Sequence, residues 1–199
     1  MATSTRTIAD IVLPRPHART TGLLRDALLV IGGVAFVALT SQVSIPLQPV
    51  PITLQTLAVL LVGAAYGWQR GAVTLLAYYL AGAAGLPLFA NHNFGIATAV
   101  GPTGGYQVGF IFAAALVGYL AEQGWDRTPW LMALAMVLGN LVIYAFGVLW
   151  LAYYLHLPIT LAIKFGLSPF LLGDAIKLGI AVILLPVAHL ALSRLGAGK

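Results

Sequence analysis

The chain contains no cysteine and very little charge. Its 199 residues include ten lysines or arginines and five aspartates or glutamates, whereas 60% of the residues are hydrophobic. The missing cysteines exclude disulfide bridges, thiolate metal sites and cysteine nucleophiles. About a quarter of the residues are charged in soluble globular domains, so the composition excludes that class and predicts an integral membrane protein. The net charge of +5 needs no nucleic-acid partner to explain it.

Motifs that would indicate enzymatic chemistry are missing as well. The chain has no G-x-x-x-x-G-K-S/T loop for nucleotide phosphates, no G-x-S-x-G and no H-E-x-x-H. No two of its four histidines stand at metal-ligand spacing. We therefore expect no enzymatic activity, no metal and no cofactor. A solute carrier of this composition must borrow energy from another protein or use a buried acid as a proton carrier.

Long uncharged runs cover residues 27–69, 71–121 and 128–163. A membrane-spanning helix needs only about 20 apolar residues, so the first two runs each hold two spans. We predict an all-α domain over 23–199 with six transmembrane helices, preceded by a basic tail over 1–22. Turn residues and charges place the spans at about 23–44, 52–69, 71–87, 105–121, 130–156 and 169–193.

Residues 1–22 show no cleavage site typical of a signal peptide, so we expect a cytoplasmic tail. An alternative that the sequence leaves open is a short amphipathic surface segment built on Ile8, Ile11, Val12 and Leu13. Between the first two spans, the three prolines of 45–51 predict a rigid connector rather than a helix.

The basic residues beside the spans predict the topology in the cell membrane. Short cytoplasmic loops are enriched in lysine and arginine, and with six spans almost all of the basic residues fall on one side. Both termini are therefore expected in the cytoplasm, and the nearly uncharged opposite loops are expected to form the mouth of a site open to the outside. The residues that carry this prediction are Arg6, Arg15, Arg19, Arg25, Arg70, Arg127, Arg194 and Lys199.

The sixth span holds an acid and a base, Asp174 and Lys177, with no other charge between Lys164 and Arg194. Three residues along a helix correspond to a rise of about 4.5 Å and bring both side chains to one face. Each charge costs on the order of 3 kcal/mol to insert into hydrocarbon, so such residues usually face a protein interior or a water-filled cavity. Asp174 and Lys177 are therefore candidate ligand-binding residues; the alternative is a self-neutralising pair.

Other polar or aromatic candidates stand near the predicted outer ends of the spans. Thr53 and Gln55 open the second span, and the loop residues Asn91 and Asn93 are ligand or lid groups, or simply solvated side chains. The glycine pair of 101–106 precedes a span, where backbone N–H groups can face an anion or carbonyl; the alternative is a tight turn for helix packing. Trp150 either stacks on an apolar ligand or belongs to an interfacial belt, which we expect for the tryptophans at 68, 125 and 130.

These motifs, taken in order, resemble the BioY family of biotin-capturing S components of energy-coupling factor (ECF) transporters. Together they cover about 135 residues, and the proline-rich segment and the Gly-Asp-x-x-Lys element are the most specific of them. The matching segments are Gln42-Val43-Ser44-Ile45-Pro46-Leu47, Pro49-Val50-Pro51-Ile52-Thr53-Leu54-Gln55-Thr56-Leu57, Arg70-Gly71-Ala72, Gly82-Ala83-Ala84-Gly85-Leu86-Pro87, Gly101-Pro102-Thr103-Gly104-Gly105-Tyr106 and Phe170-Leu171-Leu172-Gly173-Asp174-Ala175-Ile176-Lys177.

The resemblance implies a six-helix S-component fold, biotin binding near the outer surface, and a complex with a transmembrane T component and paired ABC-type ATPases that bind the ATP. It leaves open a biotin carrier that works alone or with protons, and an S component for another vitamin. A membrane enzyme that uses Asp174 and Lys177 as acid and base is a further alternative.

Biotin has a cyclic urea with two N–H donors and one carbonyl, an apolar ring and a carboxylate. Lys177 can neutralise the carboxylate or donate to a carbonyl, and Asp174 can accept from the urea N–H groups. The expected binding set, completed by polar groups and by two aromatic walls, is Asp174, Lys177, Gln55, Thr53, Asn91, Asn93, Gly105, Tyr106 and Trp150.

Overall fold

The structure is a computed structural model that describes residues 7–14, 16 and 19–196. The predictions that concern Arg6, Arg15 and Lys199 lie outside the described residues. The described elements are α1 (Ile8–Val12), α2 (Arg19–Gln42), β1 (Ser44–Ile45), β2 (Ile52–Thr53), α3 (Gln55–Tyr66), α4 (Trp68–Ala83), η1 (Ala90–His92), α5 (Ile96–Ala99), α6 (Gly104–Glu122), η2 (Trp125–Arg127), α7 (Pro129–Tyr154), α8 (Ile159–Gly166), η3 (Ser168–Phe170) and α9 (Leu171–Gly196).

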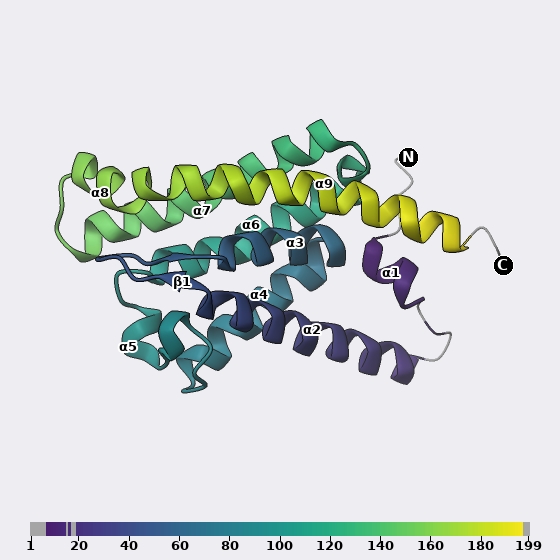
Figure 1. The fold of residues 1–199 in the computed structure, drawn as a ribbon. Helices are drawn as coiled ribbons and strands as arrows, with labels where there is room; N and C mark the ends of the chain where they lie inside the picture. Colours follow the sequence, from purple (N-terminus) through teal and green to yellow (C-terminus); the bar gives the residue numbers. More distant parts are fainter. Residues whose placement is uncertain (1–6, 15, 17–18, 197–199) are drawn as a thin grey trace.

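The long helices form an elongated bundle with α6 at its centre (Figure 1). Helix α6 packs against α3, α4 and α7, while α9 packs on α3 and α7 and α2 packs on α3 and α4. Small residues permit the close approach: a Cβ added to Gly63 would lie 2.6 Å from the carbonyl oxygen of Ala114, and one added to Gly118 would lie 2.5 Å from the backbone of Gly67. Close contact through small residues is typical of helices that pack within a membrane.

Each of the six predicted spans coincides with a helix: α2, α3, α4, α6, α7 and α9. Within the described part of the chain, four segments are long and apolar enough to cross a membrane: Thr20–Gln42, Gly104–Glu122, Pro129–Tyr154 and Ile159–Leu185. Helices α3 and α4 have 12 and 16 residues, or about 18 and 24 Å, which is less than the roughly 30 Å of a hydrocarbon core. A mostly helical architecture with segments able to span a membrane is confirmed, and the count of six crossings stays a prediction.

Helix α3 is shorter than its predicted span because both of its ends are interrupted. Residues 52–53 pair antiparallel with 44–45, so the start of the predicted span belongs to a hairpin. Gly67, with φ +83°, ends the helix at the other side; this is a backbone conformation that glycine adopts without a steric penalty. The proline-rich connector is therefore the loop of a small β-hairpin.

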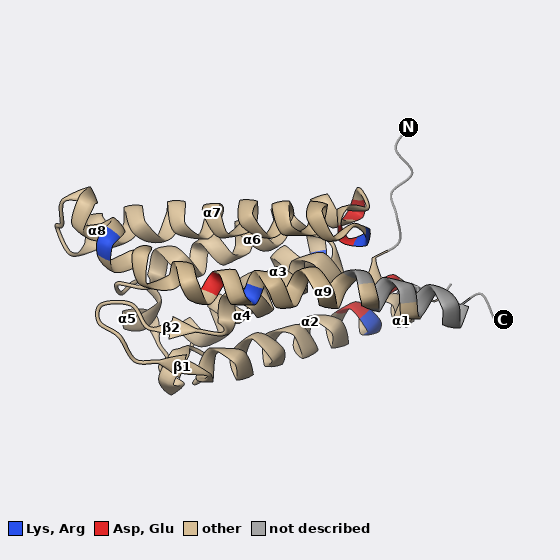
Figure 2. Ribbon diagram, turned by 45° about the horizontal axis from the view of Figure 1, so that its top comes forward, with Lys and Arg blue, Asp and Glu red and all other residues tan. Residues whose placement is uncertain are grey.

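The N-terminal segment contains helix α1, which includes Ile8, Ile11 and Val12. Asp10 of α1 accepts hydrogen bonds from Arg25 at 2.9 Å and from Arg70 at 3.0 Å, and both arginines also pair with Asp26 at 3.0 Å. Burial acts to raise the pKa of Asp10, but hydrogen bonds from Arg70 and Thr7 and the nearby positive charges lower it from 3.8 to about 2. The ion pairs tie α1 to α2 and α4, at the end of the bundle where charges gather (Figure 2).

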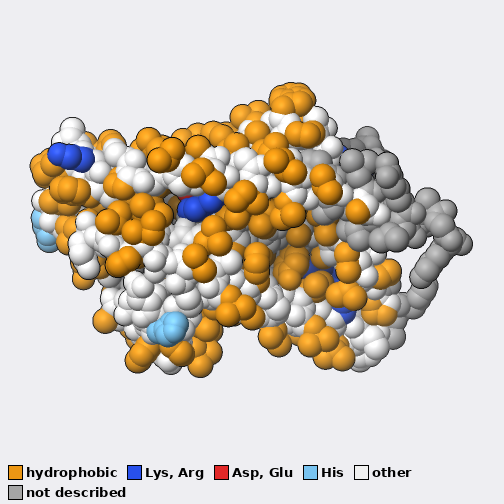
Figure 3. Space-filling model, in the orientation of Figure 1, with side chains coloured by type: hydrophobic (Ala, Val, Ile, Leu, Met, Phe, Trp, Pro, Cys, Tyr) orange, Lys and Arg blue, Asp and Glu red, His pale blue; other side chains and the backbone are white. Residues whose placement is uncertain are grey.

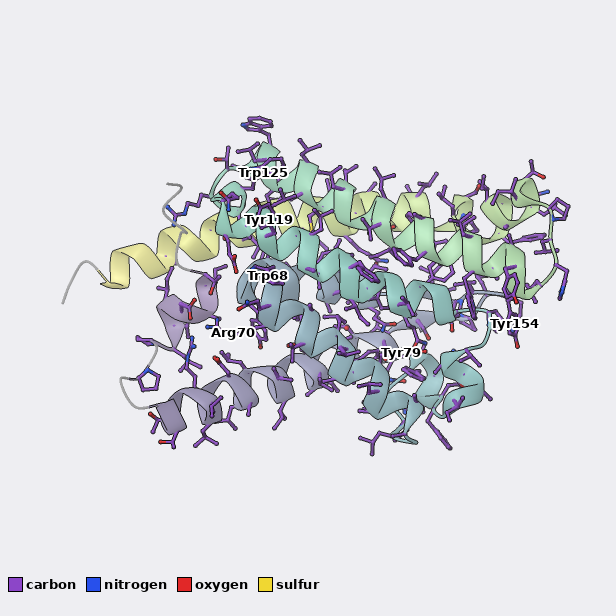
Figure 4. All side chains as sticks on the ribbon, turned by 180° about the vertical axis from the view of Figure 1, so that it is seen from behind. Trp68, Arg70, Tyr79, Tyr119, Trp125 and Tyr154 are labelled. Atoms are coloured by element: carbon purple, nitrogen blue, oxygen red, sulfur yellow. The ribbon has the colours of Figure 1, made fainter. Side chains whose placement is uncertain are left out.

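The outer helices α2 and α9 carry long apolar faces. Only 17% of the most apolar window of α2 and 22% of that in the α8–α9 segment is buried, and hydrophobic side chains cover much of the visible surface (Figure 3). Aromatic side chains lie near the bundle ends: Trp68, Tyr119 and Trp125 near one end, and Tyr79 and Tyr154 toward the other (Figure 4). An apolar band with aromatic groups at its edges suits a protein that lies in a bilayer.

Candidate functional site

A cavity of about 280 Å³ lies between the bundle core and two connecting segments, the hairpin loop 46–51 and the segment 89–93. Both segments follow the ends of helices that start at the charged end, so the cavity lies toward the opposite, nearly uncharged end. Its lining comprises Pro46, Leu47, Gln48, Pro49, Val50, Pro51, Thr53, Gln55, Thr56, Phe89, Ala90, Asn91, Asn93, Thr98, Pro102, Thr103, Tyr106, Gln107, Phe110, Ile143, Tyr144, Phe170 and Lys177.

Lys177 brings the only charge to this lining. Its Nζ donates to Asp174 Oδ1 at 3.0 Å and to Thr56 Oγ1 at 2.8 Å. An ammonium has three donors, so one N–H is left for a group in the cavity. The side chain of Asp174 lies behind Lys177 and also accepts a hydrogen bond from the hydroxyl of Tyr144.

The pair is deeply placed, because Asp174 is 7% and Lys177 is 9% exposed. Burying two charges is expensive unless they are paired and their remaining hydrogen-bonding groups are satisfied. Here the pairing along one helix face meets that condition, together with Thr56 of α3, which accepts from Lys177, and Tyr144 of α7, which donates to Asp174. The structure thus has the paired arrangement expected at three-residue spacing, and places one member of the pair at the cavity.

Two glutamine side chains add unpaired polar atoms to the same lining. Gln55 Nε2 and Gln107 Oε1 are buried and have no hydrogen-bond partner among the described residues. Buried polar atoms are nearly always hydrogen-bonded, so each such atom in a cavity wall indicates a place where a ligand can supply the missing partner. Gln107 was not predicted from the sequence, since a single amide in an apolar helix has no distinguishing pattern.

Three further predicted residues lie at the cavity but use some of their polar atoms within the protein. Asn91 Oδ1 accepts from Ser44 Oγ at 2.8 Å, and Asn93 Nδ2 donates to the carbonyl of Ala90 at 2.9 Å. Thr53 Oγ1 accepts from the backbone N–H of Gln55 at 3.3 Å. These bonds fix the walls of the cavity next to the two connecting segments.

Tyr106 lies in the cavity wall, and its hydroxyl donates to the carbonyl of Gly166 at 2.8 Å. The structure does not bring Gly105 and Trp150 to this cavity. Both line a separate apolar hollow between α4, α5, α6 and α7, where Trp150 Nε1 donates to the carbonyl of Gly101 at 2.8 Å. A Cβ added to Gly105 would lie 2.2 Å from that of Trp150, so the glycine permits α6 and α7 to touch.

Besides Tyr106, four aromatic residues that the predicted binding set does not include form walls of the cavity. Phe89, Phe110, Tyr144 and Phe170 line it, and the rings of Tyr144 and Phe170 lie 6.3 Å apart. Aromatic residues are frequent in any apolar helix, so only the spatial arrangement distinguishes these four. Within the described residues, no group of three or more histidine, cysteine, aspartate or glutamate side chains is placed to hold a metal ion.

An apolar helical bundle with a cavity lined by a lysine and by two amides with unpaired atoms has the features of a membrane protein that binds a small solute. Residues 9–194 match the BioY family. The chain belongs to the BioY family.

Curated relatives support this assignment. The chain is 43% identical to "Biotin transporter BioY" of Thermotoga maritima over 75% of this chain and 87% of that protein. It is 35% identical to "Biotin transporter BioY2" of Lactococcus lactis over 81% and 86% of the two chains, and 37% identical to "Biotin transporter BioY" of Rhizobium etli over 76% and 84%.

A solved structure has the same fold. It is described as the S-component for biotin from an ECF-type ABC transporter, and it superposes with a TM-score of 0.74 at 23% identity, covering 87% of this chain and 95% of that chain. The S-component fold expected from the sequence motifs is therefore present. Membership of a family of membrane transporters also places the chain among multi-pass cell-membrane proteins.

Proposed function

We propose that this protein captures biotin from outside the cell and mediates its uptake as the substrate-binding S component of an ECF-type ABC transporter. The observation that carries the proposal is the cavity with the Lys177 ammonium and the unpaired Gln55 Nε2 and Gln107 Oε1 in its wall. The names of the relatives, all biotin transporters, support biotin as the solute.

The chemistry of biotin fits this lining. Its carboxylate and urea carbonyl accept hydrogen bonds, which Lys177 and the Gln55 amide can donate, and its urea N–H groups can donate to the Gln107 oxygen. The cavity volume of about 280 Å³ is close to the lower limit of roughly 300 Å³ for small-molecule sites, as a compact vitamin requires. We include Asp174, Thr53, Asn91, Asn93 and Tyr106 in the proposed site as groups that complete or shape it.

We also propose six crossings with both termini in the cytoplasm, so that the cavity opens to the outside. The chain has no P-loop, and the free energy for uptake is therefore assigned to partner ATPase subunits that act through a transmembrane T component. In this assembly the protein itself is no enzyme and holds no cofactor or metal.

Equilibrium binding to the purified full chain tests the site. We expect biotin to bind far more tightly than riboflavin, thiamine or folate. Lys177→Met should weaken biotin binding by about tenfold or more, because leaving a buried group without its charged partner costs roughly 1–3 kcal/mol or more. Lys164→Met on α8, an exposed lysine, is the matched control and should bind as wild type. Undiminished affinity in a folded Lys177→Met protein, or preference for another vitamin, would contradict the proposal.

Uptake into proteoliposomes tests the energy source. Biotin accumulation should require the T component, the ATPases and ATP. Accumulation by the chain alone that disappears with the proton gradient would instead establish a proton-coupled carrier.

A further inference from the structure

The segment 89–93, which covers one side of the cavity, contains two residues in a backbone conformation that residues with side chains rarely adopt. Asn91 and His92 are consecutive and both have φ +58°. Left-handed backbone costs roughly 1–2 kcal/mol for a residue with a side chain, less for asparagine, and persists only where surrounding contacts hold it. Asn91 lines the cavity next to Ala90 and Asn93, so whatever holds this backbone also sets the position of a cavity wall.

Gln42, the last residue of α2, forms hydrogen bonds with two residues of this segment, Phe89 and His92. Its Oε1 accepts from the backbone N–H of His92 at 2.9 Å and lies 2.6 Å from the ring Nδ1 of the same residue. Its Nε2 donates to the carbonyl of Phe89 at 3.1 Å and to that of Ala38 in α2 at 3.1 Å. One side chain thus joins the helix end to Phe89, before the left-handed pair, and to His92, the second residue of that pair. Gln42 itself is not part of the cavity lining.

Neighbouring groups reinforce the same connection. Ser41 Oγ, also at the end of α2, donates to the carbonyl of Leu88 at 2.8 Å, and Tyr78 of α4 donates to that carbonyl at 3.0 Å. Ser44 Oγ in β1 holds the side chain of Asn91. The segment 88–92 is therefore attached to α2, α4 and β1, and Gln42 accepts from a backbone N–H of the left-handed pair.

We propose that Gln42 is a positioning residue for biotin: it holds 89–93 in the left-handed conformation that presents Asn91 to the cavity, without contacting the ligand. The inference rests on the proposed function for the identity of the ligand. It assigns Gln42 a task that differs from those of Lys177 and Gln55, which offer atoms to the cavity.

The first test compares Gln42→Met, which keeps the length of the side chain and removes its hydrogen bonds, with Gln123→Met, an exposed glutamine beyond α6. In ligand-free protein, hydrogen exchange of 89–93 should accelerate in Gln42→Met, the amide of His92 above all, and not in Gln123→Met. The biotin affinity should fall about tenfold in Gln42→Met, because binding must then order the released segment, and stay unchanged in the control.

The second test asks whether the backbone conformation is the cause. Glycine adopts positive φ without a steric penalty, so His92→Gly should recover part of the affinity lost in Gln42→Met, and the single His92→Gly should bind within about threefold of wild type. His92 is exposed and is not part of the cavity lining. General damage to the fold by Gln42→Met would not be repaired by glycine at this exposed position.

The outcomes separate the two proposals. Wild-type protein that does not bind biotin overturns the proposed function, while the exchange experiment still decides whether Gln42 holds the segment. Wild-type protein that binds biotin, with Gln42→Met equal to it in affinity and in exchange of 89–93, overturns the inference about Gln42. Faster exchange with unchanged affinity also overturns it, because the segment would then not position the ligand.

Discussion

At the scale of single residues, the hydroxyl of Tyr144 connects the cavity wall to the buried ion pair, since Tyr144 lines the cavity and donates to Asp174. Tyr144→Phe keeps the ring and leaves one carboxylate oxygen without that donor. A buried acceptor without a partner costs about 1–3 kcal/mol. We expect Tyr144→Phe to lower the free energy of unfolding by that amount and to weaken biotin binding by about tenfold, measured by thermal unfolding in detergent and by equilibrium binding.

The matched control for this change is Tyr153→Phe on the same helix, because the side chain of Tyr153 is 74% exposed. It should unfold and bind as wild type does. Equal losses in both variants, or no loss in Tyr144→Phe, would show that the hydroxyl does not support the ion pair.

Residue chemistry explains which parts of the site could be predicted from sequence. Asp174 and Lys177 were predictable because charges in an apolar helix are rare and expensive. Gly105 and Tyr106 are neighbours in one motif and both belong to the predicted binding set. They nevertheless face different hollows, because successive residues of a helix point about 100° apart. The sequence does not show which of two adjacent residues faces a cavity until the helix is packed.

At the scale of elements, α1 is the part of the fold whose attachment depends on charge. The folded-state pKa of Asp10 is about 2, below its ordinary 3.8, so its ionised form favours the docked helix. This stabilisation is complete above about pH 4 and is lost as the pH falls toward 2. We expect hydrogen exchange of residues 8–12 to accelerate across this range, while the exchange of the α6 core changes less.

Asp10→Asn should remove this pH dependence and expose α1 to exchange even at pH 7. A variant that keeps wild-type protection of residues 8–12, or a wild-type protein whose α1 stays protected at pH 2, would show that the ion pairs with Arg25 and Arg70 do not hold the helix.

Long elements were predicted well and short ones were not. All six predicted spans contain a helix, because apolar segments in a membrane have few other ways to satisfy their backbone. Helix α8 and the β1–β2 hairpin were not predicted, because each depends on contacts with the ends of the long helices. The prolines of 45–51 indicated rigidity but did not indicate that the chain reverses there.

At the scale of the whole molecule, charge and cavity lie toward opposite ends. The ion cluster of α1, α2 and α4 and the charges near η2 gather at one end, whereas Lys164 on α8 is at the other (Figure 2). Arginine and lysine are enriched on the cytoplasmic side of membrane proteins. The asymmetry therefore supports the proposed orientation, in which the cavity covered by the segments 46–51 and 89–93 faces outward.

This orientation can be tested cleanly because the chain has no cysteine of its own. Phe94 is exposed beside the cavity, and Phe94→Cys should react in intact cells with a maleimide that cannot cross membranes. Gln123 is exposed between α6 and α7, and Gln123→Cys should react only after the membrane is permeabilised. Both results together are expected only if an odd number of crossings separates the two sites, with α6 crossing between them. Labelling of both sites in intact cells, or the reverse order, would contradict the outward-facing cavity and with it capture from outside the cell.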